Sequence, residues 1–444
     1  MFEPIGRLLL GVVYGTIMVL LYQSLSTTWS YLGFDFRPLG TLTVPLVIVS
    51  SLPAMILPSR PTSLAQFGSW LLFFTLFQPA LIIPQLQGWV LGFDAVLLYV
   101  LLWTSTLLFF GVARIRSSPW PVPRFDRQIF WMGLVGLWIL MHGILLVFFG
   151  DQLAIAGISE VYQQRADTAA QLGTGGYLAY VITNASGAVN PVMIALGFYE
   201  RKWWAIGVGV LGQFIVYSTL AGKIVLLFPI VIIATFFLFD KNRQMKPVRF
   251  GLMMVCVALV GLPLQALRAT LGPTVEQLLD LIYMRTLYLP GVLVGAYNDF
   301  FSIYPLTYFS HSIIGRLFVE YPYGSLSVGQ IVGAYVTPSF SYAVNNYNAN
   351  FIAADGIAGL GLAGIPLIVL AAVMVLRTID KVLGTIELRL LCAANVPFLM
   401  WLADGSLPTA LLTGGGALLN LLLWLHAGCS EVPAPRAEPR TQIR

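Results

Sequence analysis

Apolar runs of about 20 residues recur along this chain from one end to the other, with short polar turns between them. A helix needs roughly 20 apolar residues to cross about 30 Å of hydrocarbon, and lipid accepts only helices or closed barrels. The runs lack the alternation of barrel strands. We therefore predict an all-α, polytopic integral membrane protein with about twelve transmembrane helices, forming a single domain over residues 1–430 with a short tail at 431–444. The predicted spans lie at about 5–25, 40–57, 63–83, 88–112, 128–150, 175–198, 203–218, 222–239, 250–267, 356–376, 387–404 and 406–427.

The composition agrees with this class of protein. Of 444 residues, 58% are hydrophobic and only 10% are charged, against roughly 25% charged in soluble domains. The net charge of +5 might suggest nucleic acid, but the basic residues lie in short loops beside spans, so membrane topology explains them and no nucleic-acid partner is expected. Cys256, Cys392 and Cys429 have no paired spacing, so no disulfide framework is implied.

Basic residues divide unequally between the two sides of the predicted membrane. With a cytoplasmic N-terminus, 18 of the 24 Lys and Arg residues fall on the cytoplasmic side, as the positive-inside rule requires, and both termini are cytoplasmic. The six exceptions lie at or beyond the outer ends of spans: Arg37, Arg165, Lys223, Arg268, Arg285 and Arg316. Lys and Arg are scarce on this outer face, so these six residues require an explanation, and binding of an anion is the obvious one.

Three outer segments are long enough to fold over the membrane: residues 26–39, 151–174 and 268–355. In the longest, Pro273 to Leu289 predicts a helix that Pro290 ends, and Pro305 to Glu320 predicts a second, amphipathic helix. An aromatic and asparagine-rich loop follows at 338–351. We expect short helices lying along the interface and capping a cavity between spans.

Arg285 and Lys223 are the strongest candidates for an anion site. Arg285 has apolar neighbours, where a guanidinium pairs or lines an aqueous site, so an ion pair with Asp280 or Asp299 and a substrate-anion role both remain open. Lys223 follows a short turn with free backbone N–H groups, which suits phosphate, although snorkelling of the side chain also explains it. Arg165 on its own reads as a solvated loop charge.

Other polar residues offer a base or a sugar contact. His311, Asp299 and Asp355 compete for the role of base, while Glu320 is expected to pair with Arg316. Tyr342, Asn346, Tyr347 and Asn350 combine flat aromatic faces with amide groups, a mixture that suits sugar rings but equally suits tight turns. No His, Asp or Glu cluster has metal-ligand spacing and no phosphate-loop motif occurs, so neither a metal nor a cofactor is predicted.

The chain resembles the Wzy-type oligosaccharide repeat-unit polymerases (O-antigen, capsular and exopolysaccharide polymerases), which are related to O-antigen ligases. The resemblance covers roughly residues 150–380. Its features are the span start at Gly222-Lys223, the Met284-Arg285 segment, the late outer loop, and Asn350-Phe-Ile-Ala-Ala-Asp355-Gly356 running into the glycine-rich 359–364.

This resemblance implies a multi-pass glycosyltransferase of the bacterial inner membrane. Such an enzyme joins oligosaccharide units carried on undecaprenyl pyrophosphate at the periplasmic face, and the lipid pyrophosphate leaves. It implies membrane lipids, a flippase and a chain-length regulator as partners, and no metal. Charge building on the pyrophosphate requires preorganised cations. The candidates are Arg165, Lys223, Arg268, Arg285 and Arg316, with Arg285 and Lys223 foremost.

Two alternatives remain open. A ligase would move a finished glycan to another acceptor with the same donor and leaving group. A flippase or transporter for a lipid-linked sugar would place ionisable residues near the membrane midplane. Here the span interiors carry few charges, and Asp94 and Asp404 lie near predicted span ends. That placement favours a site at the outer rim over a transport path.

Overall fold

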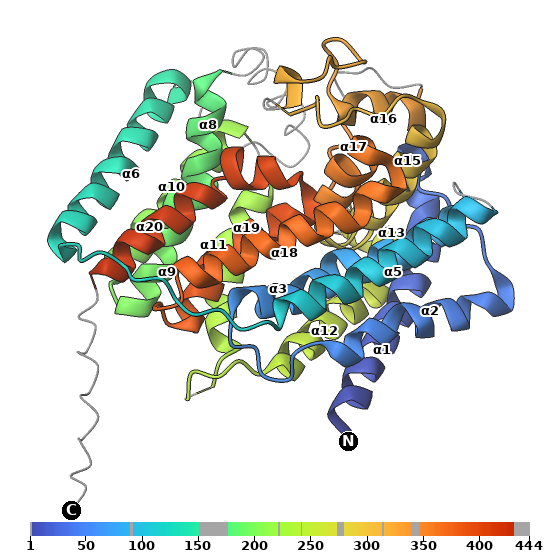
Figure 1. The fold of residues 1–444 in the computed structure, drawn as a ribbon, viewed down its shortest axis with the longest axis horizontal. Helices are drawn as coiled ribbons and strands as arrows, with labels where there is room; N and C mark the ends of the chain where they lie inside the picture. Colours follow the sequence, from blue (N-terminus) through green and yellow to red (C-terminus); the bar gives the residue numbers. More distant parts are fainter. Residues whose placement is uncertain are drawn as a thin grey trace, which may run out of the picture.

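The computed structural model describes residues 2–88, 92–150, 176–220, 223–240, 242–272, 279–312, 315–338 and 346–429. Within these ranges the chain forms helices and turns, and its one isolated β-bridge joins Phe239 and Met245. The predicted all-helical class is confirmed. Figure 1 shows the helices packed side by side in a bundle.

The first half of the chain contains α1 (Phe2–Thr28), η1 (Ser30–Leu32), η2 (Gly40–Leu42), α2 (Thr43–Ser51), η3 (Leu52–Ile56), α3 (Leu64–Leu72), η4 (Phe73–Phe77), α4 (Gln78–Gln87), α5 (Phe93–Ala113), α6 (Arg127–Phe149), α8 (Tyr177–Asn184), η6 (Ala185–Val189), α9 (Asn190–Glu200) and α10 (Trp203–Leu220). The second half contains α11 (Lys223–Phe237), α12 (Pro247–Ala266), α13 (Arg268–Leu271), η7 (Asp280–Tyr288), α15 (Leu289–Ile303), η8 (Gly315–Leu317), α16 (Val328–Val336), η9 (Ile352–Ile357), α17 (Ala358–Leu360), η10 (Gly361–Ala363), α18 (Gly364–Val382), α19 (Leu388–Asp404), η11 (Thr409–Thr413) and α20 (Gly416–Gly428).

Seven helices of the described chain are long and apolar enough to cross a membrane, which indicates a membrane protein. They are Glu3–Thr28, Leu64–Gln87, Phe93–Ala113, Arg127–Phe149, Tyr177–Glu200, Pro247–Ala266 and Ile352–Val382. Four shorter apolar helices coincide with further predicted spans: Gly40–Ile56, Trp203–Thr219, Ile224–Phe237 and Gly416–Gly428. The count of twelve spans stays a prediction.

The Leu64–Gln87 segment is the centre of the bundle, because its apolar window is buried all round. A helix that is apolar on every face is stable only inside a protein or in lipid. Aromatic rings pack tightly along it: the Phe74 ring meets Tyr14 edge-on at 4.9 Å, and Phe77 meets Phe109 at 5.2 Å. Its one mid-helix amide, Gln78, donates through Nε2 to Gly11 O at 2.7 Å and to Ser51 Oγ at 3.0 Å, so its N–H groups have partners within the core, while its Oε1 has none among the described residues.

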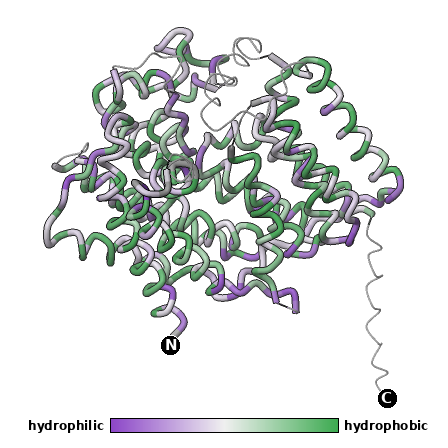
Figure 2. Tube along the Cα trace, turned by 180° about the vertical axis from the view of Figure 1, so that it is seen from behind, coloured by the Kyte–Doolittle hydropathy of each residue, from purple (hydrophilic) through white to green (hydrophobic). Residues whose placement is uncertain are grey.

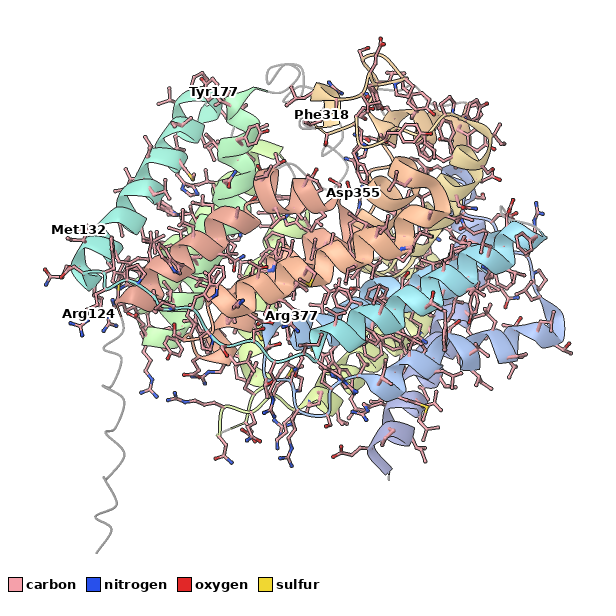
Figure 3. The ribbon with its side chains drawn as sticks, in the orientation of Figure 1. Arg124, Met132, Tyr177, Phe318, Asp355 and Arg377 are labelled. Atoms are coloured by element: carbon pink, nitrogen blue, oxygen red, sulfur yellow. The ribbon has the colours of Figure 1, made fainter. Side chains whose placement is uncertain are left out.

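Many basic residues of the predicted inner loops gather at one end of the bundle, here called the basic end. Arg377 Nη1 donates to Val112 O at 2.8 Å, and both Arg7 and Arg114 donate to Leu57 O. Arg124 and Arg377 lie on the lower side of Figure 3, whereas Tyr177, Phe318 and Asp355 lie above them. Figure 2 shows hydrophilic positions along this lower rim and a mostly hydrophobic trace above it.

Two carboxylates bind several of these cations. Glu200, whose side chain is 6% exposed, contacts Arg127 Nη2 at 2.8 Å, Lys202 Nζ at 3.0 Å and His426 Nε2 at 3.0 Å. Glu387 contacts Arg243 Nη1 at 2.7 Å and Arg389 Nε at 3.2 Å. Each cluster ties together helices that are far apart in the sequence.

The segment before and after Pro290 differs from its prediction. Residues 273–278 lie outside the described residues, but η7 runs without a break into α15, so Pro290 does not end a helix. Proline inside a helical segment removes one backbone hydrogen bond, and here Pro290 stands directly after the wide π-helical turns of η7, where the regular i to i−4 pattern is already interrupted.

The same segment also lies deeper than expected. Tyr283 Oη donates to Val257 O inside α12, and Tyr288 Oη donates to Met18 O inside α1. Nearly every residue of α15 from Pro290 to Phe301 is buried. Thus η7 and α15 pack among the apolar helices rather than over their ends.

The predicted amphipathic helix at Pro305–Glu320 is wrong for the residues that the structure describes there. Tyr308 and Phe309 have φ values of +47° and +64°, a left-handed conformation that a right-handed helix cannot contain. Thr307 N and Tyr308 N instead donate to Ala358 O and Gly359 O in α17. A long-range backbone contact therefore replaces the local helical one, and only the short η8 turn follows.

Candidate functional site

The end of the bundle opposite the basic end is here called the cap end. α15, α16 and α17 reach it at the upper right of Figure 1, and η7 and η9 come directly before α15 and α17 in the chain. Aromatic side chains stabilise it: Phe300 stacks on Tyr304 at 4.5 Å and meets Tyr335 edge-on at 5.4 Å. The candidate Asp299 accepts a hydrogen bond from Tyr335 Oη at 2.7 Å, so this carboxylate joins α15 to α16.

His311 and Asp355, two predicted site residues 44 positions apart, lie in direct contact. The distance from His311 Nε2 to Asp355 Oδ1 is 3.3 Å, and the two side chains are 13% and 1% exposed. His311 Nδ1 lies 2.8 Å from the Thr307 hydroxyl, which is also 2.9 Å from Ala358 O. The structure thus joins these residues into a chain from Ala358 O through Thr307 and His311 to Asp355.

This chain leaves no ring nitrogen of His311 free. If the ring is neutral, Nε2–H donates to Asp355 and Thr307 donates to Nδ1. If the ring is charged, Nδ1–H donates to the Thr307 oxygen while the Thr307 proton goes to Ala358 O. In both states the carbonyl also receives Thr307 N–H. A base needs a free lone pair within reach of the proton that it removes, so the geometry gives His311 a structural contact instead.

Asp355 is equally occupied. Its Oδ2 accepts from Leu407 N at 2.6 Å, so both carboxylate oxygens have partners. Leu407 belongs to Asp404-Gly-Ser-Leu-Pro408, here called the 404–408 turn, which joins α19 to η11. A charged acceptor holding a backbone N–H fixes the conformation of such a turn.

The 404–408 turn also brings Arg285 into this region. η7, which carries Arg285, packs against α19, whose last residue is Asp404. Arg285 is exposed and makes no hydrogen bond or ion pair with any described residue. The expected ion pair between Arg285 and Asp299 does not form, because Asp299 bonds to Tyr335; the Asp280 side chain lies outside the description.

The backbone of Lys223 reaches the same level of the bundle. The Arg389 guanidinium lies 5.5 Å from the Phe236 ring, so the end of α11 lies beside the start of α19, and the two helices pack together. At about 1.5 Å per residue, α11 rises about 20 Å from Phe236 back to Lys223 and α19 about 22 Å from Arg389 to Asp404. Lys223 therefore starts α11 close to the level of Asp404; its side chain lies outside the described residues.

Comparison with protein-family models, curated proteins and solved structures finds no match.

The remaining candidate cations have other partners or lie outside the described residues. Arg268 Nη1 donates to Thr28 Oγ1 at the end of α1. Arg316 Nε donates to Ser310 O at 3.1 Å, and its guanidinium lies 5.3 Å from the Tyr321 ring rather than in an ion pair with Glu320. Arg165 lies outside the described residues. The described contacts of Arg316 do not connect it to Arg285.

The four predicted sugar contacts differ in accessibility. Tyr347 is buried and its Oη donates to Leu32 O at 2.6 Å; Asn350 is fully buried, and its Nδ2 donates to Pro290 O at 3.0 Å. These two side chains hold the chain before η9 in place and present no surface to a sugar. Asn346 is exposed, and Tyr342 lies outside the described residues.

Three π-helical segments border the candidate site. η7 carries Arg285, η9 carries Asp355, and η11 follows the 404–408 turn. Such turns are rare and are frequently found at functional sites. The sequence noted Asp404 only as an acid near a span end, and it gave no role to Thr307; neither residue belongs to a motif. Among the described residues, no group of three or more His, Cys, Asp or Glu could hold a metal ion.

Proposed function

We propose that this protein is a membrane glycosyltransferase that polymerises oligosaccharide repeat units carried on undecaprenyl pyrophosphate. In this proposal about twelve spans cross the bacterial inner membrane, both termini are cytoplasmic, and the cap end faces the periplasm. The lipid pyrophosphate is the leaving group. A flippase would supply the lipid-linked units, and a chain-length regulator would act on the product.

One observation carries the proposal: Arg285 is exposed and unpaired within the described structure, although its helix packs among apolar helices. A charge at membrane depth costs at least about 2.5 kcal/mol, so it pairs or lines an aqueous site. A guanidinium binds phosphate oxygens in a bidentate manner and keeps its charge at all relevant pH values. Arg285 would therefore bind the pyrophosphate, with Lys223 on the neighbouring α11 as its partner.

The remaining predicted roles follow this geometry. Arg165, Arg268 and Arg316 are retained as peripheral cations along the lipid headgroups, and Asn346 as the accessible sugar contact. The occupied hydrogen bonds of His311, Asp355 and Asp299 favour positioning roles over that of base.

The test is extension of short undecaprenyl-pyrophosphate-linked oligosaccharides by the purified protein in liposomes. The expected wild-type product is a ladder. Arg285→Ala should lower the rate about 10²–10³-fold, which is the usual cost of one electrostatic donor at a developing anion, and Arg285→Lys should lower it less. Arg37→Ala is the matched control, because Arg37 is an exposed arginine that contacts Asp35 instead.

Three results would overturn parts of this proposal. Extension by Arg285→Ala at the wild-type rate would remove Arg285 from the site. A single transfer to a different acceptor would establish the ligase alternative. Movement of the lipid-linked sugar across the bilayer without a new glycosidic bond would establish the flippase alternative.

A further inference from the structure

Asp404 differs from Asp299 and Asp355 because its oxygens have no hydrogen-bond partner among the described residues. It is the last residue of α19, is half-buried, and makes no hydrogen bond with any described residue. In contrast, both oxygens of Asp355 are occupied and Asp299 binds Tyr335. Glu320 is exposed in the cap, beyond the short η8 turn. Among the described carboxylates at the cap end, Asp404 is therefore the one that combines free oxygens with a place on a helix that packs against η7.

η7, which carries Arg285, packs against α19, which ends at Asp404, yet the two opposite charges form no ion pair. A purely structural ion pair would be hydrogen-bonded, because keeping two buried charges apart is costly. Arg285 and Asp404 therefore both keep hydrogen-bonding groups that are free for a bound substrate. A partly buried carboxylate held beside a cation is suited to accept a proton.

We propose that Asp404 is the proton acceptor of the transfer reaction, next to Arg285 as the anion site. This rests on the proposed function. The acceptor hydroxyl oxygen attacks the anomeric carbon and forms the new C–O bond, while its proton passes to an Asp404 oxygen. The bond from the anomeric carbon to the pyrophosphate oxygen breaks, and its electron pair leaves with the lipid pyrophosphate, whose added charge Arg285 stabilises.

The surroundings of Asp404 are consistent with this role. η7, which carries Arg285, packs against α19, and Leu407 in the same turn as Asp404 donates to Asp355, which contacts His311. Of the other helices packed on α19, α9 and α20 place their charged groups, Glu200 and His426, at the basic end. α11 begins at Lys223. The Asp355–His311 pair thus positions the 404–408 turn, which carries the proton acceptor Asp404. Loss of the pair would lower the rate of transfer by displacing Asp404.

Binding and turnover separate this role from a structural one. Asp404→Asn should lower kcat about 10²–10⁴-fold. It should bind undecaprenyl pyrophosphate as tightly as wild type or more tightly, because a negative charge beside the anion is gone. Arg285→Gln should weaken that binding. Asp404→Glu keeps a carboxylate and should recover part of kcat, which excludes misfolding as the cause. Asp94→Asn, an exposed acid at the start of α5, is the control.

The pH profile provides a second readout. Loss of the Arg285 charge makes the Asp404 carboxylate harder to ionise, so the acidic limb of kcat in Arg285→Gln should move to higher pH, while Arg37→Gln leaves it unchanged. Asp404→Asn with kcat within threefold of wild type, or an unmoved acidic limb in Arg285→Gln, would overturn the inference. These outcomes require an active wild type, so they differ from failure of the proposed function, in which wild type itself forms no glycosidic bond.

Discussion

Replacing Asp355 by two different residues separates its hydrogen bonds from its charge. In Asp355→Asn, the amide oxygen can accept from Leu407 N and the amide N–H can donate to His311 Nε2. His311 then carries its proton on Nδ1 and donates to Thr307, whose own proton goes to Ala358 O at 2.9 Å. Every buried polar group keeps a partner. In Asp355→Ala, Leu407 N–H and His311 Nε2 lose theirs.

The expected magnitudes follow from these bonds. A hydrogen bond to a charged group contributes about 1.5–3 kcal/mol and a neutral one about 0.5–1.5 kcal/mol, while an unsatisfied buried group costs about 1–3 kcal/mol. Asp355→Asn exchanges two charged bonds for neutral ones but no longer buries a charge, so it should cost about 0–2 kcal/mol. Asp355→Ala should cost roughly 3–5 kcal/mol.

Thermal unfolding in detergent, followed by the fluorescence of the 11 tryptophans, should rank wild type and Asp355→Asn close together and well above Asp355→Ala. Glycan extension by Asp355→Asn should stay within about tenfold of wild type, because a positioned turn suffices. An Asp355→Asn protein with normal unfolding and no extension would assign Asp355 to the chemistry. An Asp355→Ala protein as stable as wild type would refute the hydrogen-bond accounting.

Two further predictions concern stability away from Arg285. Asp380, buried in α18, accepts from Leu64 N at 2.5 Å and Ala65 N at 3.0 Å at the start of α3. Asp380→Ala should therefore lower the free energy of unfolding by roughly 3–5 kcal/mol, whereas the control Asp94→Ala should lower it by about 1 kcal/mol or less. Equal melting temperatures for the two variants would contradict this prediction. The hydrogen bond to the Asp299 carboxylate, together with burial, raises the pKa of Tyr335 to about 12 from 10.0, so the stabilisation by Tyr335 is complete below about pH 10 and is lost as the pH rises towards 12. The difference in melting temperature between wild type and Tyr335→Phe should therefore be constant up to about pH 10 and shrink above it; a difference that changes near neutral pH would count against this.

The sequence predicted the helices because their apolar runs carry the signal locally. Glu3–Thr28, Phe93–Ala113 and Arg127–Phe149 lie within a few residues of the predicted spans. The basic end was also foreseeable, since charge asymmetry between loops is a property of the sequence alone. Pro290 misled the prediction because proline marks both the end of one helix and the first turn of the next.

The candidate site depended on contacts that the sequence could not provide. Arg285 was selected from the sequence as an unusual cation, whereas Asp404 belongs to another helix, α19, against which η7 packs. Asp355 meets Leu407 across 52 residues and His311 across 44. No local pattern indicates that both ring nitrogens of His311 and both carboxylate oxygens of Asp355 have hydrogen-bond partners. Because they do, Asp404 is proposed as the base instead.

The burial of α15 has a consequence for how the protein is made. α15 packs against α4, which is synthesised earlier, and against η9, which is synthesised later. With η7 it carries Asp280, Arg285 and Asp299. The full set of packing contacts around α15 can therefore form only after η9 has been synthesised. The position of the Arg285 segment thus depends on parts of the chain that are made both before and after it.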